Sequence, residues 1–295
     1  MFNGGFIMKM AVLAGVCVFA LAACSGPETF DPGSDEVEDR SESGSGGNAK
    51  TLAEASEDRA KREAEKAASA KADNFKDNEK SGKAERDFSY SWPKQVSAIP
   101  GLAKLIGEKR DEALSAQKKE WKESVDEFGT DECTSCVTRD FSTEWKVITD
   151  LSRFLSLSSG SYVYGGGAHG NSFTDSLIWD RKAEASINTI TLFKSTSALW
   201  SAAGDDYCKA LDKVRAKRRG EPVQDGGFGS ECPGLEELTL MAGSSNGKTF
   251  DRLGLIADPY VAGPYVEGSY EVTLPVSKSI LDAVKPEYRE YFSVG

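Results

Sequence analysis

The stretch Phe88-Ser89-Tyr90-Ser91-Trp92-Pro93 alternates large aromatic side chains with serines, which is the period of a strand with one buried face. From Pro100 onward, apolar residues recur every three or four positions, as in an amphipathic helix, and Gly129 marks its end. A strand followed by a long helix predicts a domain in which that helix packs on a sheet.

The same patterns predict the elements of the rest of the chain. Strands are expected at 141–147, 173–180, 235–241, 250–257 and 270–274, and helices at 195–218 and 277–284. Two short strands, 154–157 and 162–164, are expected to pair around Ser158-Ser159-Gly160. The irregular alternation of strands and helices predicts the α+β class, with an antiparallel-rich sheet, the long N-terminal helix and a second helix near 195–218.

The N-terminus has the form of a bacterial lipoprotein signal. An apolar run follows Lys9 and ends at Leu21-Ala22-Ala23-Cys24, and it is too short to span a bilayer comfortably. We expect cleavage of residues 1–23 and a lipid on Cys24, which anchors the protein to a membrane. Ser25 after the cysteine favours the outer membrane, facing the periplasm.

The composition changes sharply after the signal. Residues 24–87 are rich in charged and small side chains, so we expect a disordered or transiently helical tether. Nearly all aromatic residues follow, which predicts a globular ectodomain at 88–292 with possible subdomains 88–185 and 186–292. The formal net charge of −11 argues against nucleic acid and favours basic proteins as partners.

Four cysteines remain after the signal and the lipidation site, and four thiols permit three pairings. In an exported protein we favour Cys208–Cys232, which would close a poorly packed insertion at 212–231, together with a local Cys133–Cys136 pair. Redox catalysis and zinc binding are the alternatives for the Cys133–Cys136 pair. Its acidic neighbours raise a thiol pKa, and no second closely spaced ligand pair is present, so no metal or cofactor is expected.

His169 is the only histidine, and it lies in the glycine-rich segment Gly165-Gly166-Gly167-Ala168-His169-Gly170. Glycines allow a tight turn, which would hold the imidazole in a defined place. As a catalytic residue it would be a general base, but no His-Glu-x-x-His motif accompanies it. A structural or binding role is therefore the preferred interpretation, and an enzyme is not the first expectation.

Several motifs resemble a family of paired uncharacterised extracytoplasmic domains, found in the ectodomain of a lysozyme-sensing anti-sigma factor and in an accessory region of a peptidoglycan deacetylase. The motifs are Phe88-Ser-Tyr-Ser-Trp-Pro93, Ile99-Pro100, Ser156-Leu157, Gly-Gly-Ala-His-Gly at 166–170, Trp179-Asp180, Leu192-Phe193, Asp258-Pro-Tyr260 and Gly263-Pro-Tyr265. The resemblance implies an α+β ectodomain that binds ligands related to the cell wall.

Three functions follow from these observations. The first is a lipid-anchored binding module for peptidoglycan or for a basic, lysozyme-type wall hydrolase. Its binding residues would be Tyr164, His169, Tyr260 and Tyr265, because tyrosine offers stacking area with a polar tip. The alternatives are an envelope scaffold that binds other proteins and a hydrolase that uses His169.

Overall fold

The structure is a computed structural model that describes residues 65, 69–223, 226 and 229–295, all within one unit, Lys50–Gly295. The expected signal peptide, the lipidation site Cys24 and most of the expected tether lie outside these residues. In the described part of the chain, no helix combines the length and the apolar character that a membrane crossing requires.

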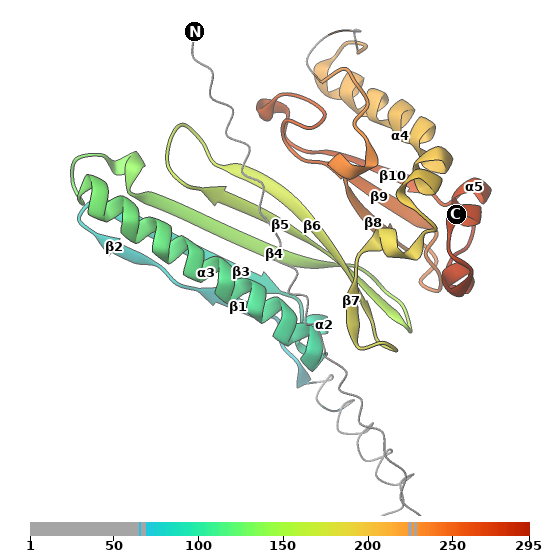
Figure 1. The fold of residues 1–295 in the computed structure, drawn as a ribbon, viewed down its shortest axis with the longest axis horizontal. Helices are drawn as coiled ribbons and strands as arrows, with labels where there is room; N and C mark the ends of the chain where they lie inside the picture. Colours follow the sequence, from blue (N-terminus) through green and yellow to red (C-terminus); the bar gives the residue numbers. More distant parts are fainter. Residues whose placement is uncertain (1–64, 66–68, 224–225, 227–228) are drawn as a thin grey trace, which may run out of the picture. The chain divides into compact units, whose positions relative to one another are not determined.

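A seven-stranded sheet occupies the first half of this unit (Figure 1). Its strands are β1 (Asp73–Lys76), β2 (Glu79–Ser81), β3 (Ala84–Trp92), β4 (Thr138–Asp150), β5 (Phe154–Tyr164), β6 (Asn171–Asp180) and β7 (Ala185–Ile187). Their order is β1-β3-β4-β5-β6-β7, with β2 beside β3. Only β3 and β4 pair in parallel, because the helix α3 (Pro100–Phe128) connects them.

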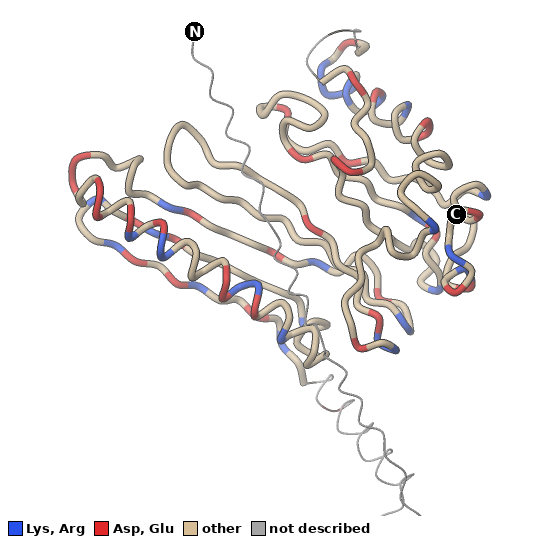
Figure 2. The backbone as a smooth tube through the Cα atoms, in the orientation of Figure 1, with Lys and Arg blue, Asp and Glu red and all other residues tan. Residues whose placement is uncertain are grey.

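One face of this sheet is apolar and packs against α3. The side chains of Phe88, Tyr90 and Trp92 are buried on it, together with Leu102 and Ile106 of the helix. The alternation that the sequence predicted for 88–92 is therefore confirmed. Acidic and basic residues alternate on the outer surface of α3 (Figure 2), as expected of a helix with one solvated face.

A second, three-stranded sheet follows in the order β10-β9-β8. It contains β8 (Thr239–Gly243), β9 (Arg252–Ala257) and β10 (Tyr270–Pro275), and the helices α4 (Thr196–Arg219) and α5 (Lys278–Ala283) accompany it. The remaining helix, the short α2 (Lys94–Ser97), comes directly before α3 in the chain. The core of the second sheet also includes Phe154 and Ile178, which project from the large sheet on the side opposite α3. The second sheet thus covers one end of that face, and the remainder of the face carries polar side chains.

The predicted α+β class and both long helices are confirmed. Pro100 occupies the first position of α3, and Gly129 ends the helix with a φ of 69°. The hydroxyl of Ser195 accepts a hydrogen bond from the backbone N–H of Ala198 at 3.0 Å and so caps α4.

The hairpin predicted around Ser158-Ser159-Gly160 is wrong, because 154–164 forms one continuous strand. Small polar residues in this segment are strand residues with partners on both sides. The hydroxyls of Ser161 and Thr143 on the neighbouring strand, for example, are 2.8 Å apart and buried. The chain instead reverses at 165–170, before β6.

Among the described residues, the first strand begins at Asp73, earlier than the predicted domain boundary at residue 88. The ring of Phe75 packs edge-on against Phe88 at 6.1 Å. The buried Arg86 pairs with Asp77 at 2.5 Å, so charged residues that suggested a solvated tether hold β1 and its neighbours to the sheet. The described part of the expected tether is therefore folded from Asp73 onward.

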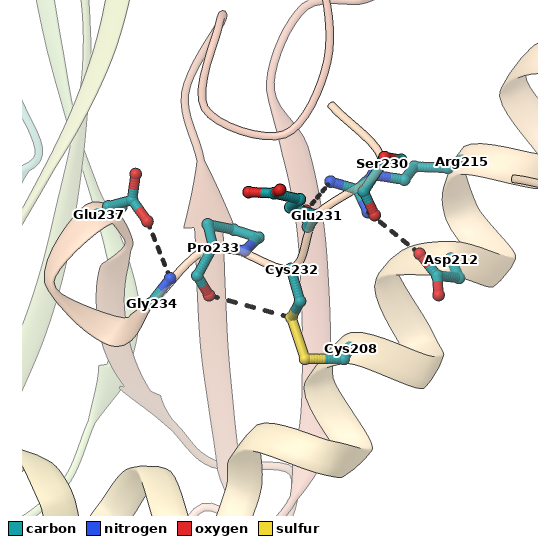
Figure 3. Close-up of a disulfide and its surroundings, with 9 residues drawn as sticks. All are labelled: Cys208, Asp212, Arg215, Ser230, Glu231, Cys232, Pro233, Gly234 and Glu237. Carbon is teal, nitrogen blue, oxygen red and sulfur yellow. Dashed lines mark hydrogen bonds and ion pairs between the residues drawn. A yellow bond between two sulfur atoms is a disulfide. The ribbon is translucent and has the colours of Figure 1, made fainter. Parts of the chain in front are cut away.

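Both expected disulfides, Cys208–Cys232 and Cys133–Cys136, are present. The prediction that 212–231 packs poorly is wrong for its first half, because α4 continues to Arg219. Arg215 is fully buried beside the Cys208–Cys232 disulfide (Figure 3). Its guanidinium donates to the carbonyls of Ala262, Ser230 and Glu231 at 2.8 to 3.2 Å.

Candidate binding site

The turn between β5 and β6 holds the only histidine. Gly166 has a φ of 97°, and a Cβ atom there would lie 2.9 Å from the carbonyl oxygen of Ser135, so only glycine fits. A Cβ atom at Gly170 would overlap the ring of Tyr162. The glycines therefore let the turn pack closely on two neighbours, which places the exposed side chain of His169 at the end of the large sheet.

A second loop, 258–269, reaches the same place from the smaller sheet. Asp258 anchors it to the free edge of β6, because its carboxylate accepts from the N–H and the hydroxyl of Thr174, both at 2.9 Å. Further along, Arg219 holds Glu267 through two contacts of 2.9 Å. Between these anchors, Tyr260 has a φ of 75°, which is unusual for a bulky residue and marks a constrained loop.

Three rings meet where the two loops touch. The imidazole of His169 stacks on Tyr265 with ring centroids 4.1 Å apart and 23° between the planes. Tyr260 lies 5.6 Å from Tyr265, and its hydroxyl is 3.4 Å from Nε2 of His169. Tyr260 is 50 % exposed, and Val266 beside Tyr265 is 88 % exposed. We call His169, Tyr260 and Tyr265 the ring cluster.

The ring cluster borders a cleft of about 500 Å³ in the polar face of the large sheet. Tyr162, Tyr164, His169 and Tyr265 line one side of the cleft, and Glu85, Asp87 and Asp140 line its floor. The hydroxyl of Tyr164 donates to the carbonyl of Gly167 at 2.9 Å, so this side chain also supports the turn. The structure thus brings the four residues singled out in the sequence into one region, and their role in binding stays a prediction.

The floor of the cleft is acidic. Asp87 and Asp140 are direct neighbours in the parallel register of β3 and β4. Burial raises the pKa of Asp140, and the negative charge of Asp87 raises it further. Neither carboxylate has an ion-pair partner among the described residues. The nearby Arg139 is buried and forms an ion pair with Glu120 of α3. Its Nε lies 3.0 Å from Oε1 of that glutamate.

Glu85, Asp87, Asp140 and Tyr162 also line the cleft, and none of them was predicted as a site residue from the sequence. The alternation in β3 was the available signal, since it places the residues between the buried aromatics on the opposite face. Their convergence with β4 depends on the parallel β3–β4 register, which the sequence pattern does not specify. The described part of the chain contains no group of three or more His, Cys, Asp or Glu side chains arranged to hold a metal ion.

The surroundings of His169 suit a structural contact better than proton transfer to a substrate. Its Nδ1 lies 2.8 Å from the carbonyl oxygen of Gly170, and its Nε2 faces the hydroxyl of Tyr260. Within the described residues, no serine, cysteine or carboxylate side chain is hydrogen-bonded to the ring. Both nitrogens are therefore engaged locally, and the ring face is covered by Tyr265.

Comparisons with known proteins agree with this architecture. Residues 78–172, which include most of the polar face and the His169 turn, match the family model described as deacetylase PdaC. A DUF3298 family protein from Pseudomonas aeruginosa is 16 % identical, with a TM-score of 0.51 over 74 % of this chain and 96 % of that one, and therefore shares the fold.

A second solved structure, a DUF3298 family member from Bacteroides fragilis, is 15 % identical over 76 % of this chain and 97 % of that chain, with a TM-score of 0.41. No curated protein matches the chain in sequence at a significant level. Residues 78–172 are therefore similar to the PdaC family, and the chain shares its fold with a DUF3298 family protein, in line with the expected resemblance to paired uncharacterised domains.

Proposed function

We propose that this protein is a non-catalytic binding module of the cell envelope that binds the glycan of peptidoglycan at the ring cluster and the adjoining cleft. One observation carries the proposal: two loops from different sheets hold three rings together at the rim of a polar cleft. Sugar rings bind to such sites by stacking on aromatic faces while polar side chains hydrogen-bond their hydroxyls.

The placement in the cell is part of the proposal. A lipid on Cys24 would hold the protein at the outer membrane, and the tether would let the folded part reach the wall from the periplasmic side. The two disulfides are consistent with an oxidising compartment outside the cytosol. The PdaC-like domain supports a connection with peptidoglycan.

The acidic floor of the cleft favours a second candidate, a basic wall hydrolase of lysozyme type. Asp87 and Asp140 carry no partner cation among the described residues, and a basic protein would supply one. An envelope scaffold that binds other proteins is the remaining binding alternative, and it does not require the ring cluster to contact sugars.

Titration calorimetry with soluble muropeptides and, separately, with lysozyme tests the proposal. We expect muropeptide binding that Tyr265→Ala weakens about tenfold, the equivalent of one lost stacking contact. Phe128→Ala, which removes a 41 % exposed aromatic residue outside the cleft lining, is the matched control. Binding to lysozyme alone would favour the second candidate, and binding to neither ligand would overturn both.

A further inference from the structure

The cleft beside the ring cluster is one end of a longer groove. It shares Tyr162 with a second hollow of about 520 Å³, lined by Ser89, Ser142 and Ser172 among others. That hollow in turn shares Ser91 and Glu144 with a third, which reaches Lys146. From Thr138 to Lys146 the groove follows β4 for roughly 26 Å, at the rise of an extended strand.

Serines and carboxylates line the groove along β3 and β4, because the register of these strands places them on the same face. Ser89 lies opposite Ser142, and Ser91 lies opposite Glu144, all on the face away from α3. On the next strand, Gly160 lies opposite Glu144, and an added Cβ atom there would meet nothing within 4 Å. The absence of a side chain at this position leaves the groove open between its two halves.

The groove also has one wall. Ser269 and Tyr265, from the loop 258–269, line the groove beside β6. The bond between Asp258 and Thr174 fixes this loop to the strand edge. A long groove with a wall and a stacking platform at one end suits a chain that lies along the strands, rather than a compact small molecule.

The charges that line the groove indicate which kind of ligand chain it would bind. Glu85 and Glu144 have Lys80 and Lys146 as partners at 3.5 and 2.9 Å, so their charges are largely matched. Asp87 and Asp140 add two carboxylates without partner cations among the described residues. A ligand with positive charges spaced along it is therefore more complementary to the groove than a neutral or anionic chain.

We propose that the groove binds an amino-sugar glycan that carries free amino groups, with its hydroxyls on the serines, an ammonium group at Asp87 and Asp140, and a sugar ring on Tyr260 or Tyr265. This inference rests on the proposed function and specifies its ligand. The raised pKa of Asp140 agrees with an unmet charge that a bound ammonium group would stabilise.

The test compares two sugars of equal length, the hexamer of glucosamine and the hexamer of N-acetylglucosamine, in calorimetry with the full-length protein. We expect tighter binding of the glucosamine hexamer and a steep loss of that preference with added salt. The double variant Asp87→Asn, Asp140→Asn should bind the glucosamine hexamer about tenfold less tightly, while its affinity for the acetylated hexamer stays unchanged. Glu271→Gln, on the exposed face of β10, is the control for net charge.

The outcomes separate the amino-sugar inference from the more general proposal of glycan binding. Equal or tighter binding of the acetylated hexamer overturns the amino-sugar inference and leaves the glycan-binding function standing. Binding of neither hexamer overturns the inference, and muropeptide binding then decides the function separately. An equal loss of affinity with Glu271→Gln would mean that overall charge, and not the groove, attracts the glycan.

Discussion

The imidazole ring of His169 stacks on the phenol ring of Tyr265 at a centroid distance of 4.1 Å. This contact joins the β5–β6 turn of the large sheet to the loop that follows β9 of the small sheet. Each loop is constrained separately, by glycines in one and by Asp258 and Glu267 in the other. The ring contact therefore aligns two preformed loops, which would keep the proposed binding surface organised in the absence of ligand.

Replacement of Tyr265 separates the stacking area from the hydroxyl group. Tyr265→Phe keeps the ring on His169, so we expect an unchanged position of the turn and a modest loss of affinity for muropeptides. Tyr265→Ala removes the ring, and amide exchange in 165–170 should then become faster along with the loss of binding. Unchanged exchange in Tyr265→Ala would show that the glycines alone hold the turn.

The Cys133–Cys136 disulfide lies beneath the His169 turn. The carbonyl of Ser135 packs on Gly166, and the carbonyl of Cys136 accepts from the guanidinium of Arg139 at 2.9 Å. Cys133→Ser with Cys136→Ser should lower the free energy of unfolding by about 2 kcal/mol, because the closed loop is short. It should also weaken glycan binding through the loosened turn. Urea denaturation and calorimetry measure the two effects.

The Cys208–Cys232 disulfide provides the matched comparison. Cys208→Ser with Cys232→Ser opens a longer loop, so the free energy of unfolding should fall by about 3.5 kcal/mol. Neither cysteine lines the groove, so glycan affinity should persist in the folded fraction. If this variant lost binding as strongly as the first, support of the His169 turn by the local disulfide would not explain the effect.

Glu267 makes the loop of Tyr265 sensitive to acid. Its hydrogen bonds with Arg219 lower its pKa below the ordinary 4.5 and outweigh the opposite effect of burial. The ionised carboxylate therefore stabilises the folded state above pH 4.5, and this stabilisation is lost as the pH falls through the lowered pKa. Glu267→Gln should cost about 2 kcal/mol at neutral pH and nothing in strong acid, as urea denaturation at several pH values will show.

The sequence was sufficient for the elements whose patterns are local. The alternation in 88–92 and the spacing from Pro100 to Gly129 reflect burial of one face, which side-chain chemistry determines directly. The residues 154–164 were misassigned because serine and glycine are common both in turns and in strands that carry a polar face. Arg215 was assigned to a loosely packed insertion because its hydrogen-bond partners are not visible in the sequence. The carbonyls of Ala262, Ser230 and Glu231 reach its guanidinium only in the folded chain.

The site was predictable in part for the same reason. The glycine-rich turn and the two Pro-Tyr segments stood out as local motifs, and the fold brings His169, Tyr260 and Tyr265 together. The acidic floor depends on the pairing of β3 with β4 across a long helix. Such non-local pairing leaves no mark at Asp87 or Asp140 individually, so the charge of the groove became apparent only in three dimensions.

Asp140 should show opposite effects on stability and on binding. Its pKa is raised above the ordinary 3.8 by burial and by Asp87, so its ionised form destabilises the folded state. This penalty is complete above the raised pKa and disappears below 3.8, where the carboxyl is protonated in both the folded and the unfolded states. Asp140→Asn should therefore unfold at a higher urea concentration than the wild type at pH 7, and the two proteins should converge near pH 3. The same variant should bind the glucosamine hexamer less tightly, because it lacks a charge that the ligand would neutralise. A variant that is less stable at pH 7 would mean that the carboxylate has a structural partner, and its role in the groove would then have to be reassigned.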